Sequence, residues 1–389
     1  THAADQLALA TLPLTATLLL DAGPGLVGLL VALQGTAWLT ISLPAGAWID
    51  RLPRRNLLIA ALALGLCASM VAVLAAAMGA AALLGLAAFV GASGTVVYVL
   101  TSVSLLPGLV KAADLPRSNA RLELARAMMG LLAPFIAGLL AQRLSPTWGY
   151  GLAALGAGLA LLCVVALPKA SAPAQPTARP RFIDSIKTGA RFVLKHDLLR
   201  GIGLCAIFWN FAFFALLAIW APLALTVLKL DPATLGLAQS ALGAGQIAGA
   251  LIAPYTSRAF APLVTLIFGP AISVVGVALF LLALQFDRFA GPAVGFFLIG
   301  FGPMLWLICQ TTVRQLVTPV HLMGRVNATL QTAMYGMRPL GALAGGLLAA
   351  QAGLDAALAL VATCFVLSAL SIVLSPLARL RAMPQPVHA

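Results

Sequence analysis

Long apolar runs, each about the length needed to cross a lipid bilayer, follow one another along most of this chain. A helix needs about 20 consecutive apolar residues to span the hydrocarbon core of a membrane. Only 8% of the residues are charged, too few to give a soluble domain of this size its usual charged surface. Windows of that length predict twelve membrane-spanning helices in an all-α membrane protein, at residues 1–21, 26–49, 56–78, 81–106, 119–142, 147–167, 201–229, 234–257, 263–285, 289–314, 327–351 and 355–376.

The second half of the chain repeats the first half at a constant offset of 208 residues. The segment RSNARLELARAMMGLLAPFIAGLLA from Arg117 aligns with RVNATLQTAMYGMRPLGALAGGLLA from Arg325, and GLLVALQG from Gly28 aligns with GLAQSALG from Gly236. The offset maps each predicted span of the first half onto one of the second. Because six is an even number, both copies have the same membrane orientation, which predicts two pseudo-symmetric six-helix bundles. The same offset predicts that the given sequence begins inside helix one.

A segment rich in proline, alanine and charge separates the sixth and seventh runs. We therefore predict a first bundle at 1–168, a cytoplasmic linker at 169–200 and a second bundle at 201–389. Phe182 to Leu199 has apolar residues at helical spacing, with cations one turn apart. This part predicts a basic amphipathic helix on the cytoplasmic leaflet.

Lysine and arginine residues gather in the loops on one side of the predicted bundles, and such loops face the cytoplasm. The net charge of +13 follows from them and does not require a nucleic-acid partner. Both termini are expected in the cytoplasm of a multi-pass inner-membrane protein. The loops on the opposite side carry only the cations Arg143, Lys229 and Arg288. The cations on the cytoplasmic side are Arg51, Arg54, Arg55, Lys111, Arg117, those from Lys169 to Arg200, Arg258, Arg314, Arg325, Arg379 and Arg381.

The loop between the second and third runs reads Gly46-x-x-x-Asp50-Arg51-x-x-Arg54-Arg55. With the 6+6 spans, it resembles the signature of the major facilitator superfamily, although Pro53 stands where a glycine is usual. GLLAPFIAGLL resembles the superfamily's antiporter motif, with Ala133 before Pro134. ADQLALATLPL, LLPGLVKAADLPRSNARL and RQLVTPVHLMGRVNATLQ are similar to the enterobactin-exporter and macrolide-efflux-like branch, whose members are proton-driven exporters of bacterial inner membranes. The helix-four arginine of many drug antiporters has no counterpart in GASGTVVYVLTSV.

The resemblance implies that this loop is a conformational latch made of Gly46, Asp50, Arg51, Arg54 and Arg55. Asp50 would lie near the start of helix eleven, where the partial positive charge of a helix N-terminus favours a carboxylate. The arginines would pair with acids or lipid phosphates. An alternative is that Arg54 and Arg55 only mark the cytoplasmic face. The second half has Arg258 in place of Asp50, so the latch is one-sided.

Three residues are candidates for proton coupling. Asp5 lies in the first predicted span, and a carboxylate inside a membrane must face water or be protonated. His2 is three residues earlier, on the same helix face, and could share its proton. Glu123, the only glutamate, lies beside Arg121 and Arg126. The alternatives are structural hydrogen bonding for Asp5 and His2, and an ion pair or a gate for Glu123.

In the fold that the resemblance implies, helices one, four, seven and ten line a central substrate cavity. The polar and aromatic residues on the last three are Tyr98, Ser102, Trp209, Asn210, Trp306 and Gln310. Packing is the alternative role for the aromatic ones. Arg338, deeper in helix eleven, needs an acidic partner or an anionic substrate. Gln34 on helix two is a weaker cavity candidate.

These observations predict a secondary transporter that exports a small amphiphilic molecule, siderophore-like or drug-like, by alternating access in exchange for protons. A lipid or lysophospholipid transporter of the same fold is the alternative. We expect a monomer whose partners are its substrate, protons and membrane lipids. The five single cysteines, the four scattered histidines and the absence of a phosphate-binding loop predict no enzyme activity, no metal and no cofactor.

Overall fold

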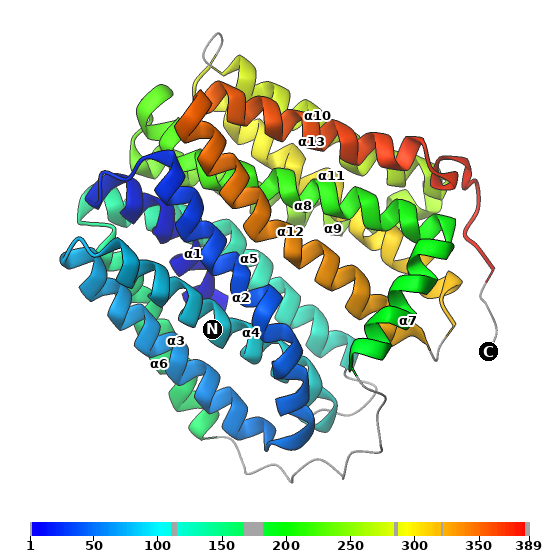
Figure 1. The fold of residues 1–389 in the computed structure, drawn as a ribbon, viewed down its shortest axis with the longest axis horizontal. Coiled ribbons are helices and arrows are strands. Elements are labelled where there is room, and N and C mark those ends of the chain that lie inside the picture. The colour runs from blue at the N-terminus through cyan, green and yellow to red at the C-terminus, as the bar shows by residue number, and fades with distance from the viewer. Residues whose placement is uncertain (1, 110–114, 167–181, 284–286, 320–321, 386–389) are drawn as a thin grey trace. The chain divides into compact units, whose positions relative to one another are not determined.

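The computed structural model describes residues 2–109, 115–166, 182–283, 287–319 and 322–385 (Figure 1). Within these ranges, twelve helices have 18 to 30 residues each. They are α1 (His2–Leu19), α2 (Pro24–Arg51), α3 (Arg54–Ala77), α4 (Ala81–Leu109), α5 (Leu115–Arg143), α6 (Thr147–Val165), α8 (Asp197–Pro222), α9 (Pro232–Ala259), α10 (Pro262–Leu282), α11 (Ala290–Val317), α12 (Met323–Ala352) and α13 (Leu354–Val373). A shorter α7 (Phe182–Lys195) precedes α8, a π-helical segment (Leu223–Val227) follows α8, and a 3-10 turn (Pro376–Arg379) follows α13.

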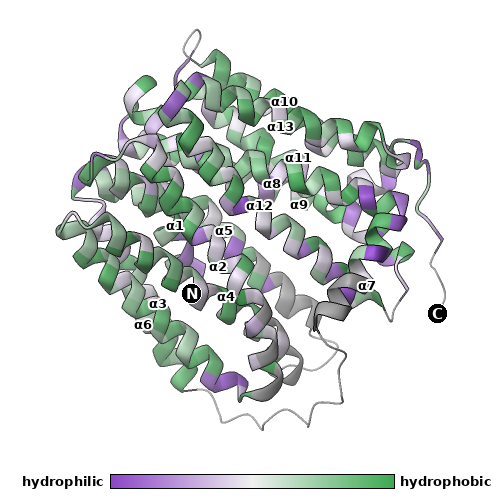
Figure 2. Ribbon diagram, viewed as in Figure 1, coloured by the Kyte–Doolittle hydropathy of each residue, from purple (hydrophilic) through white to green (hydrophobic). Residues whose placement is uncertain are grey.

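The prediction of an all-α membrane protein is confirmed. Each of the twelve long helices begins and ends within four residues of a predicted span, when the π-helical segment is counted with α8. Ten of them, within the described ranges, are long and apolar enough to cross a membrane. The other two carry charges inside their length, Asp5 in α1 and Arg338 in α12. Figure 2 shows hydrophobic residues along most of the long helices.

The chain forms two compact units, the first made of the described parts of residues 1–178 and 218–240. In this unit α3 packs on α4 and α6, while α1 packs on α5 and α6. Small residues allow these close approaches. A Cβ at Gly94 would lie 2.6 Å from the carbonyl oxygen of Ala61, and a Cβ at Gly149 would collide with Thr11.

The second unit comprises the described parts of residues 179–217 and 241–389. Here α10 packs on α11 and α13, and α12 packs on α13. The contact between Gly94 and Ala61 recurs at the residues 208 positions later, where a Cβ at Gly302 would lie 2.8 Å from the Gly269 oxygen. The repeat seen in the sequence is therefore a repeat of helix packing as well.

The linker helix α7 belongs to the second unit and packs on α12. Its residue Val193 is buried in a core cluster that includes Val326 and Leu330. Gly189 lies so close to the Arg325 carbonyl that no Cβ fits there. The sequence predicts one helix from Phe182 to Leu199, but the structure ends α7 at Lys195 and starts α8 at Asp197. Leu199 is fully buried within α8 and joins the same core.

Candidate functional site

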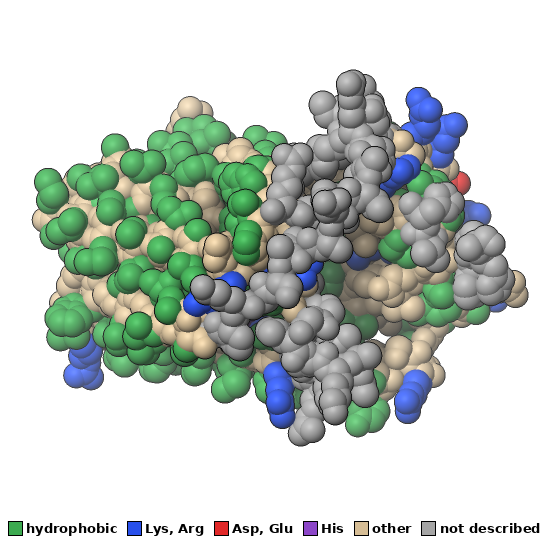
Figure 3. Space-filling view, turned by 90° about the horizontal axis from the view of Figure 1, so that it is seen from below, with side chains coloured by type: hydrophobic (Ala, Val, Ile, Leu, Met, Phe, Trp, Pro, Cys, Tyr) green, Lys and Arg blue, Asp and Glu red, His purple; other side chains and the backbone are tan. Residues whose placement is uncertain are grey.

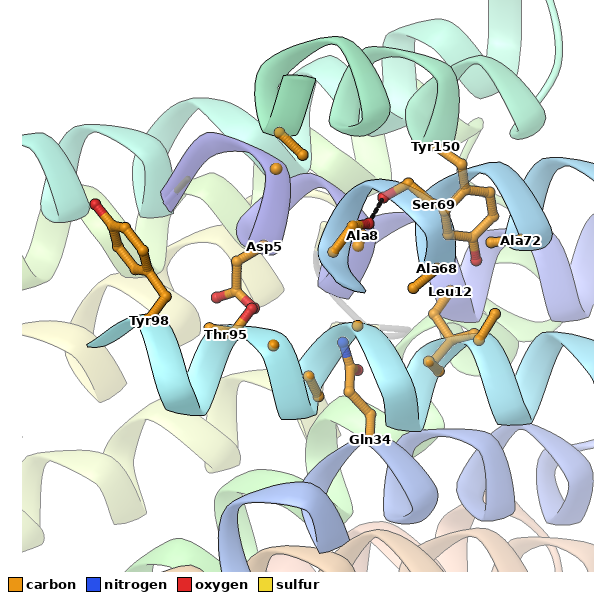
Figure 4. Close-up of a pocket in the computed structure, with 18 of the residues that line it drawn as sticks. Asp5, Ala8, Leu12, Gln34, Ala68, Ser69, Ala72, Thr95, Tyr98 and Tyr150 are labelled. Carbon is orange, nitrogen blue, oxygen red and sulfur yellow. Dashed lines mark hydrogen bonds between the residues drawn. The ribbon is translucent and has the colours of Figure 1, made fainter. Parts of the chain in front are cut away.

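Asp5 lies in the first turn of α1, with polar side chains from its own and a neighbouring helix around it. Gln6 Nε2 donates a hydrogen bond to Asp5 Oδ2 at 3.2 Å, and the Thr95 hydroxyl on α4 is a second partner (Figure 4). The charges of Arg126 on α5 and of His2 are close enough to act on this carboxylate. Hydrogen bonds donated to a carboxylate stabilise its charged form, whereas burial away from water favours the protonated form.

His2 and Tyr98, which the sequence assigns to proton coupling and to the cavity, are neighbours in the first unit. Their rings meet edge to face, with centroids 6.0 Å apart and planes at 81°. Asp5, Thr95 and Tyr98 lie together at one end of a pocket (Figure 4). The structure thus brings together three of the predicted residues, His2, Asp5 and Tyr98.

The pocket lies inside the first unit, between α1, α2, α3, α4 and α6. It holds about 640 Å³ of space not filled by atoms, including the part that is open to the outside. Fifteen of its 21 lining residues are alanine, glycine or leucine, and the polar ones are Asp5, Gln34, Ser69, Thr95, Tyr98 and Tyr150. It follows the helices, from Asp5 to Leu12 on α1 and from Tyr98 back to Leu84 on α4. At 1.5 Å per helical residue, these stretches correspond to about 10–20 Å.

Gln34 and Tyr150 are the buried polar residues farther along this pocket. Gln34 is 8% exposed, and its Oε1 atom has no hydrogen-bond partner among the described residues. Tyr150 is 3% exposed and lies at the end opposite Asp5 (Figure 4). The sequence indicates Gln34 only weakly, and it does not indicate Thr95, Ser69 or Tyr150. Serine, threonine and tyrosine are common in membrane helices, so their types alone carry no signal.

A second polar group surrounds Arg338 in the second unit. Arg338 Nε donates a hydrogen bond to Asn210 Oδ1 at 3.3 Å, while Asn210 Nδ2 donates to the Ala206 carbonyl at 2.9 Å. The Arg338 guanidinium lies over the rings of Tyr335 and Phe214, at 4.4 and 5.0 Å from their centroids. Such stacking stabilises a cation where water is scarce. The sequence predicts that both Arg338 and Asn210 contact substrate, and the structure places them in contact with each other.

The remaining predicted cavity residues bond or pack inside their own units, although Trp306 Nε1 and Gln310 Oε1 have no hydrogen-bond partner among the described residues. Trp209 Nε1 donates to Ser273 Oγ at 3.2 Å, and its ring stacks on Phe213. Trp306 is part of the buried core of the second unit, packed beside Gly269. The other two bond within their helices, Gln310 to the Leu307 carbonyl at 3.2 Å and Ser102 to the Tyr98 carbonyl at 2.7 Å. Their role in a cavity stays a prediction.

The charged loop joins the end of α2 to the start of α3. Arg55 Nη2 donates to the Val165 carbonyl at 2.6 Å, at the last residue of α6. A Cβ at Gly46 would meet no atom within 4 Å. Arg54 is partly buried at the first residue of α3. The side chains of Asp50, Arg51 and Glu123 lie outside the described part of the structure, so the latch and the role of Glu123 stay predictions.

Two helical repeats, each with a charged residue inside a long helix, agree with the comparison to known families. The model of the Major Facilitator Superfamily matches residues 1–342. The chain belongs to the Major Facilitator Superfamily. This membership makes it a transporter, the kind of protein that the superfamily comprises. The resemblance predicted from the loop motif is thereby confirmed.

Curated relatives of this superfamily member include two proteins named Enterobactin exporter EntS. The one from Salmonella choleraesuis (strain SC-B67) is 27% identical over 307 residues, covering 77% of this chain and 72% of the relative. The one from Shigella boydii serotype 4 (strain Sb227) is 28% identical over 308 residues, covering 78% and 71%.

Solved structures of other transporters share the fold of this superfamily member. The nucleoside transporter NupG has a TM-score of 0.74 at 14% identity, covering 96% of this chain and 96% of its own. A bacterial homologue of the iron transporter ferroportin, in an inward-facing state, has a TM-score of 0.74 at 16% identity and covers 95% of both chains. A D-xylose-proton symporter has a TM-score of 0.73 at 13% identity, covering 98% and 96%.

Proposed function

We propose that this transporter exports a small amphiphilic molecule, siderophore-like or drug-like, by alternating access in exchange for protons. Its location would be the bacterial inner membrane, with both termini in the cytoplasm and with domains at 1–168, 169–200 and 201–389. The relatives named as enterobactin exporters support the direction and the class of substrate.

The observation that carries proton exchange is the place of Asp5. Its carboxyl lies inside the helix bundle, beside the neutral Thr95 hydroxyl and the Gln6 amide. An ionised carboxylate at mid-bilayer costs at least about 2.5 kcal/mol, so taking up a proton there is favourable when the site closes to water. Arg126 and His2 lie near enough to favour the charged form when it opens. A carboxyl balanced in this way can take up a proton on one side and release it on the other.

The test compares Asp5→Asn with Asp21→Asn in proteoliposomes, using enterobactin and the dye ethidium as separate probes. Asp21 is exposed in the turn after α1, and its positive φ of 46° is one that asparagine adopts readily. We expect a proton gradient directed against substrate movement to drive export by the wild type and by Asp21→Asn, but not by Asp5→Asn. Gradient-driven export that persists in Asp5→Asn would falsify the role of Asp5. Export of both probes that survives complete collapse of the gradient would exclude proton exchange.

The alternative substrate class is tested in the same vesicles. A fluorescent lysophospholipid is added as a third probe. If it is the only probe of the three to move, and if its movement needs the gradient, the protein is a proton-coupled lysophospholipid transporter and the siderophore-like or drug-like class is wrong.

A further inference from the structure

At several repeat-related positions, the second unit has larger buried side chains than those that line the pocket of the first unit. Four small lining residues, Ala72, Ala88, Gly91 and Ala157, correspond at the 208-residue offset to larger residues in the second half. Those larger residues are Phe280, Phe296, Ile299 and Phe365, each at most 2% exposed. The Phe280 and Phe296 rings pack edge to face at 5.0 Å. At these four positions, small side chains leave space in the first repeat that larger side chains fill in the second.

The polar lining differs between the repeats in the same way. Asp5, Gln34 and Ser69 line the pocket of the first unit, whereas the corresponding residues of the second are Phe213, Leu242 and Val277. At these three positions the first repeat has polar side chains where the second has apolar ones. Loose packing alone does not account for a carboxyl, an amide and a hydroxyl at these positions.

The polar groups of the pocket include several hydrogen-bond acceptors. The Ser69 hydroxyl donates its proton to the Gly65 carbonyl at 2.9 Å, which leaves its lone pairs for other donors. Gln34 Oε1 is buried without a partner among the described residues, and an unmet buried acceptor is costly. Asp5 adds a carboxylate at one end. Acceptors in a narrow space fit water, which brings two donors per molecule and meets such groups in protein interiors.

We propose that this pocket holds a chain of water molecules that carries protons to and from Asp5 within the first bundle. The chain would run past Gln34 and Ser69 toward Tyr150, which lies three residues from the start of α6. At that end Leu12 and Leu84 are buried beside Tyr150, whose hydroxyl is a polar group of the lining. Protons would thus reach Asp5 by a route lined by one repeat. The inference rests on the proposed function, in which Asp5 exchanges protons.

Other charged and titratable groups near Asp5 bear on its protonation. They are His2 on α1, Tyr98 on α4, Arg126 on α5 and Tyr150 on α6 at the far end of the pocket. Of these, Tyr98 and Tyr150 line the pocket itself. The route predicts that changes along the pocket alter how fast Asp5 exchanges its proton, while His2 and Arg126 alter the pH at which it does so.

The experiment measures proton exchange at Asp5 directly and needs no substrate. The purified full chain in lipid is observed by infrared difference spectroscopy, and the carboxyl band of Asp5 is assigned by its loss in Asp5→Asn. The pH is lowered until this band appears, and the time course of its isotope shift is recorded after a change to D2O. Four variants are compared with the wild type: Gln34→Leu, Tyr150→Phe, Ala88→Phe and Ala82→Phe.

Gln34→Leu and Tyr150→Phe remove polar atoms with little change in volume, and Ala88→Phe installs the residue of the second repeat. We expect each to slow the exchange by about tenfold or more. Ala82→Phe is the matched control, because Ala82 is exposed on the same helix as Ala88. In this variant we expect the proton of Asp5 to exchange at the wild-type rate. The folding of Ala88→Phe is judged by its melting temperature. If this variant does not fold, the exchange rates of Gln34→Leu and Tyr150→Phe alone test the route.

Wild-type exchange rates in both Gln34→Leu and Tyr150→Phe would overturn the route, as would equal slowing by Ala82→Phe. If Ala88→Phe exchanges normally but no longer exports enterobactin or ethidium, the pocket is a substrate site and the inference is wrong. Failure of the proposed function is separate, because it appears as export that survives collapse of the proton gradient or as gradient-driven export by Asp5→Asn. The infrared measurement reports the route whether or not any substrate moves.

Discussion

At the scale of single residues, Arg55 shows how a charge expected for one purpose takes a local structural role. Its guanidinium donates to the Val165 carbonyl at 2.6 Å and so satisfies one of the carbonyls at the end of α6. The last carbonyls of a helix have no partner within it, and they carry a partial negative charge. The sequence interpretation of Arg55 as a latch or as a topology signal did not include this bond, because it joins residues 110 positions apart.

Asp231, just before α9, allows a test of helix capping by pH. Its Oδ1 atom accepts from the Thr234 backbone amide at 3.0 Å, and its Oδ2 atom bonds the Thr234 hydroxyl. These hydrogen bonds, first of all that with the Thr234 side chain, hold the pKa of Asp231 below its usual value. We expect Asp231→Ala to lower the free energy of unfolding by about 0.5–1 kcal/mol at neutral pH, because a cap at an exposed site is lost.

The pH dependence of this cap has a definite sign. A carboxyl whose pKa is lower in the folded state adds stability that is fully present above its unfolded pKa, about 3.9. The added stability is lost as the pH falls through the lower folded value. Melting temperatures of the wild type and Asp231→Ala should therefore differ at neutral pH and converge as the pH falls below the folded pKa of Asp231. A difference that stays constant over this range would contradict the cap.

The functional residues could be predicted from the sequence only in part. Asp5 stands out because a carboxyl inside an apolar span is rare and costly. Thr95 does not, since most threonines in these helices bond to the carbonyl of a preceding turn, as Thr36 does with Ala32 at 2.8 Å. Its contact with Asp5 depends on how α4 is rotated relative to α1, which no local pattern contains.

At the scale of elements, the spans were predictable because each helix must satisfy its own backbone groups in lipid. The break between α7 and α8 was not, because helical spacing continues across it from Phe182 to Leu199. The structure ends α7 at Lys195 and starts α8 at Asp197, and Val193 and Leu199 enter the same core from these two helices. Apolar periodicity alone does not distinguish one straight helix from two that meet at an angle.

The contact of α5 with the start of α9 is made by glycines on both helices. A Cβ at Gly236 would collide with the Pro134 carbonyl, and a Cβ at Gly138 would collide with the Pro232 carbonyl. Ser240 Oγ accepts from the Phe135 backbone amide at 3.1 Å, next to the proline. Close approach of small residues is a main source of helix association in membranes.

Gly236→Ala tests this contact. We expect it to destabilise the protein by about 1–3 kcal/mol, because the added methyl group has no space and the helices must separate. Gly130→Ala is the control, since a Cβ at Gly130 on α5 meets no atom within 4 Å. Thermal unfolding in lipid nanodiscs compares the two, and equal melting temperatures would show that α5 and α9 do not approach as described.

At the scale of the whole molecule, apolar side chains cover much of the face seen in Figure 3, with lysine and arginine at a few places.

The repeat preserves helix packing while the lining residues diverge. Gly94 and Gly302 make equivalent contacts, yet Tyr98 lines a pocket whereas its counterpart Trp306 is packed in a core. The sequence predicts both residues as cavity candidates, but it could not predict which of them would line a pocket, because that depends on several residues acting together.

Cysteine labelling tests the membrane orientation. Leu52 and Met78, at opposite ends of α3, are 44% and 74% exposed. With Cys67 and Cys163 changed to serine, we expect Met78→Cys to react with a membrane-impermeant maleimide on intact cells. Leu52→Cys should react only after the cells are opened, because it lies beside the arginine-rich loop. The reverse pattern would place both termini outside.

The packing of α7 on α12 has a consequence for dividing the gene. Because Gly189 and Val193 are part of the second unit, a polypeptide that begins just before Phe182 keeps that core closed. A polypeptide that begins at Gly201 lacks Val193 and Leu199, which pack in the same core cluster as Val326 and Leu330. A gene split into two fragments, whose products reassemble in the membrane, should therefore be divided just before the codon for Phe182 rather than at the start of the seventh span.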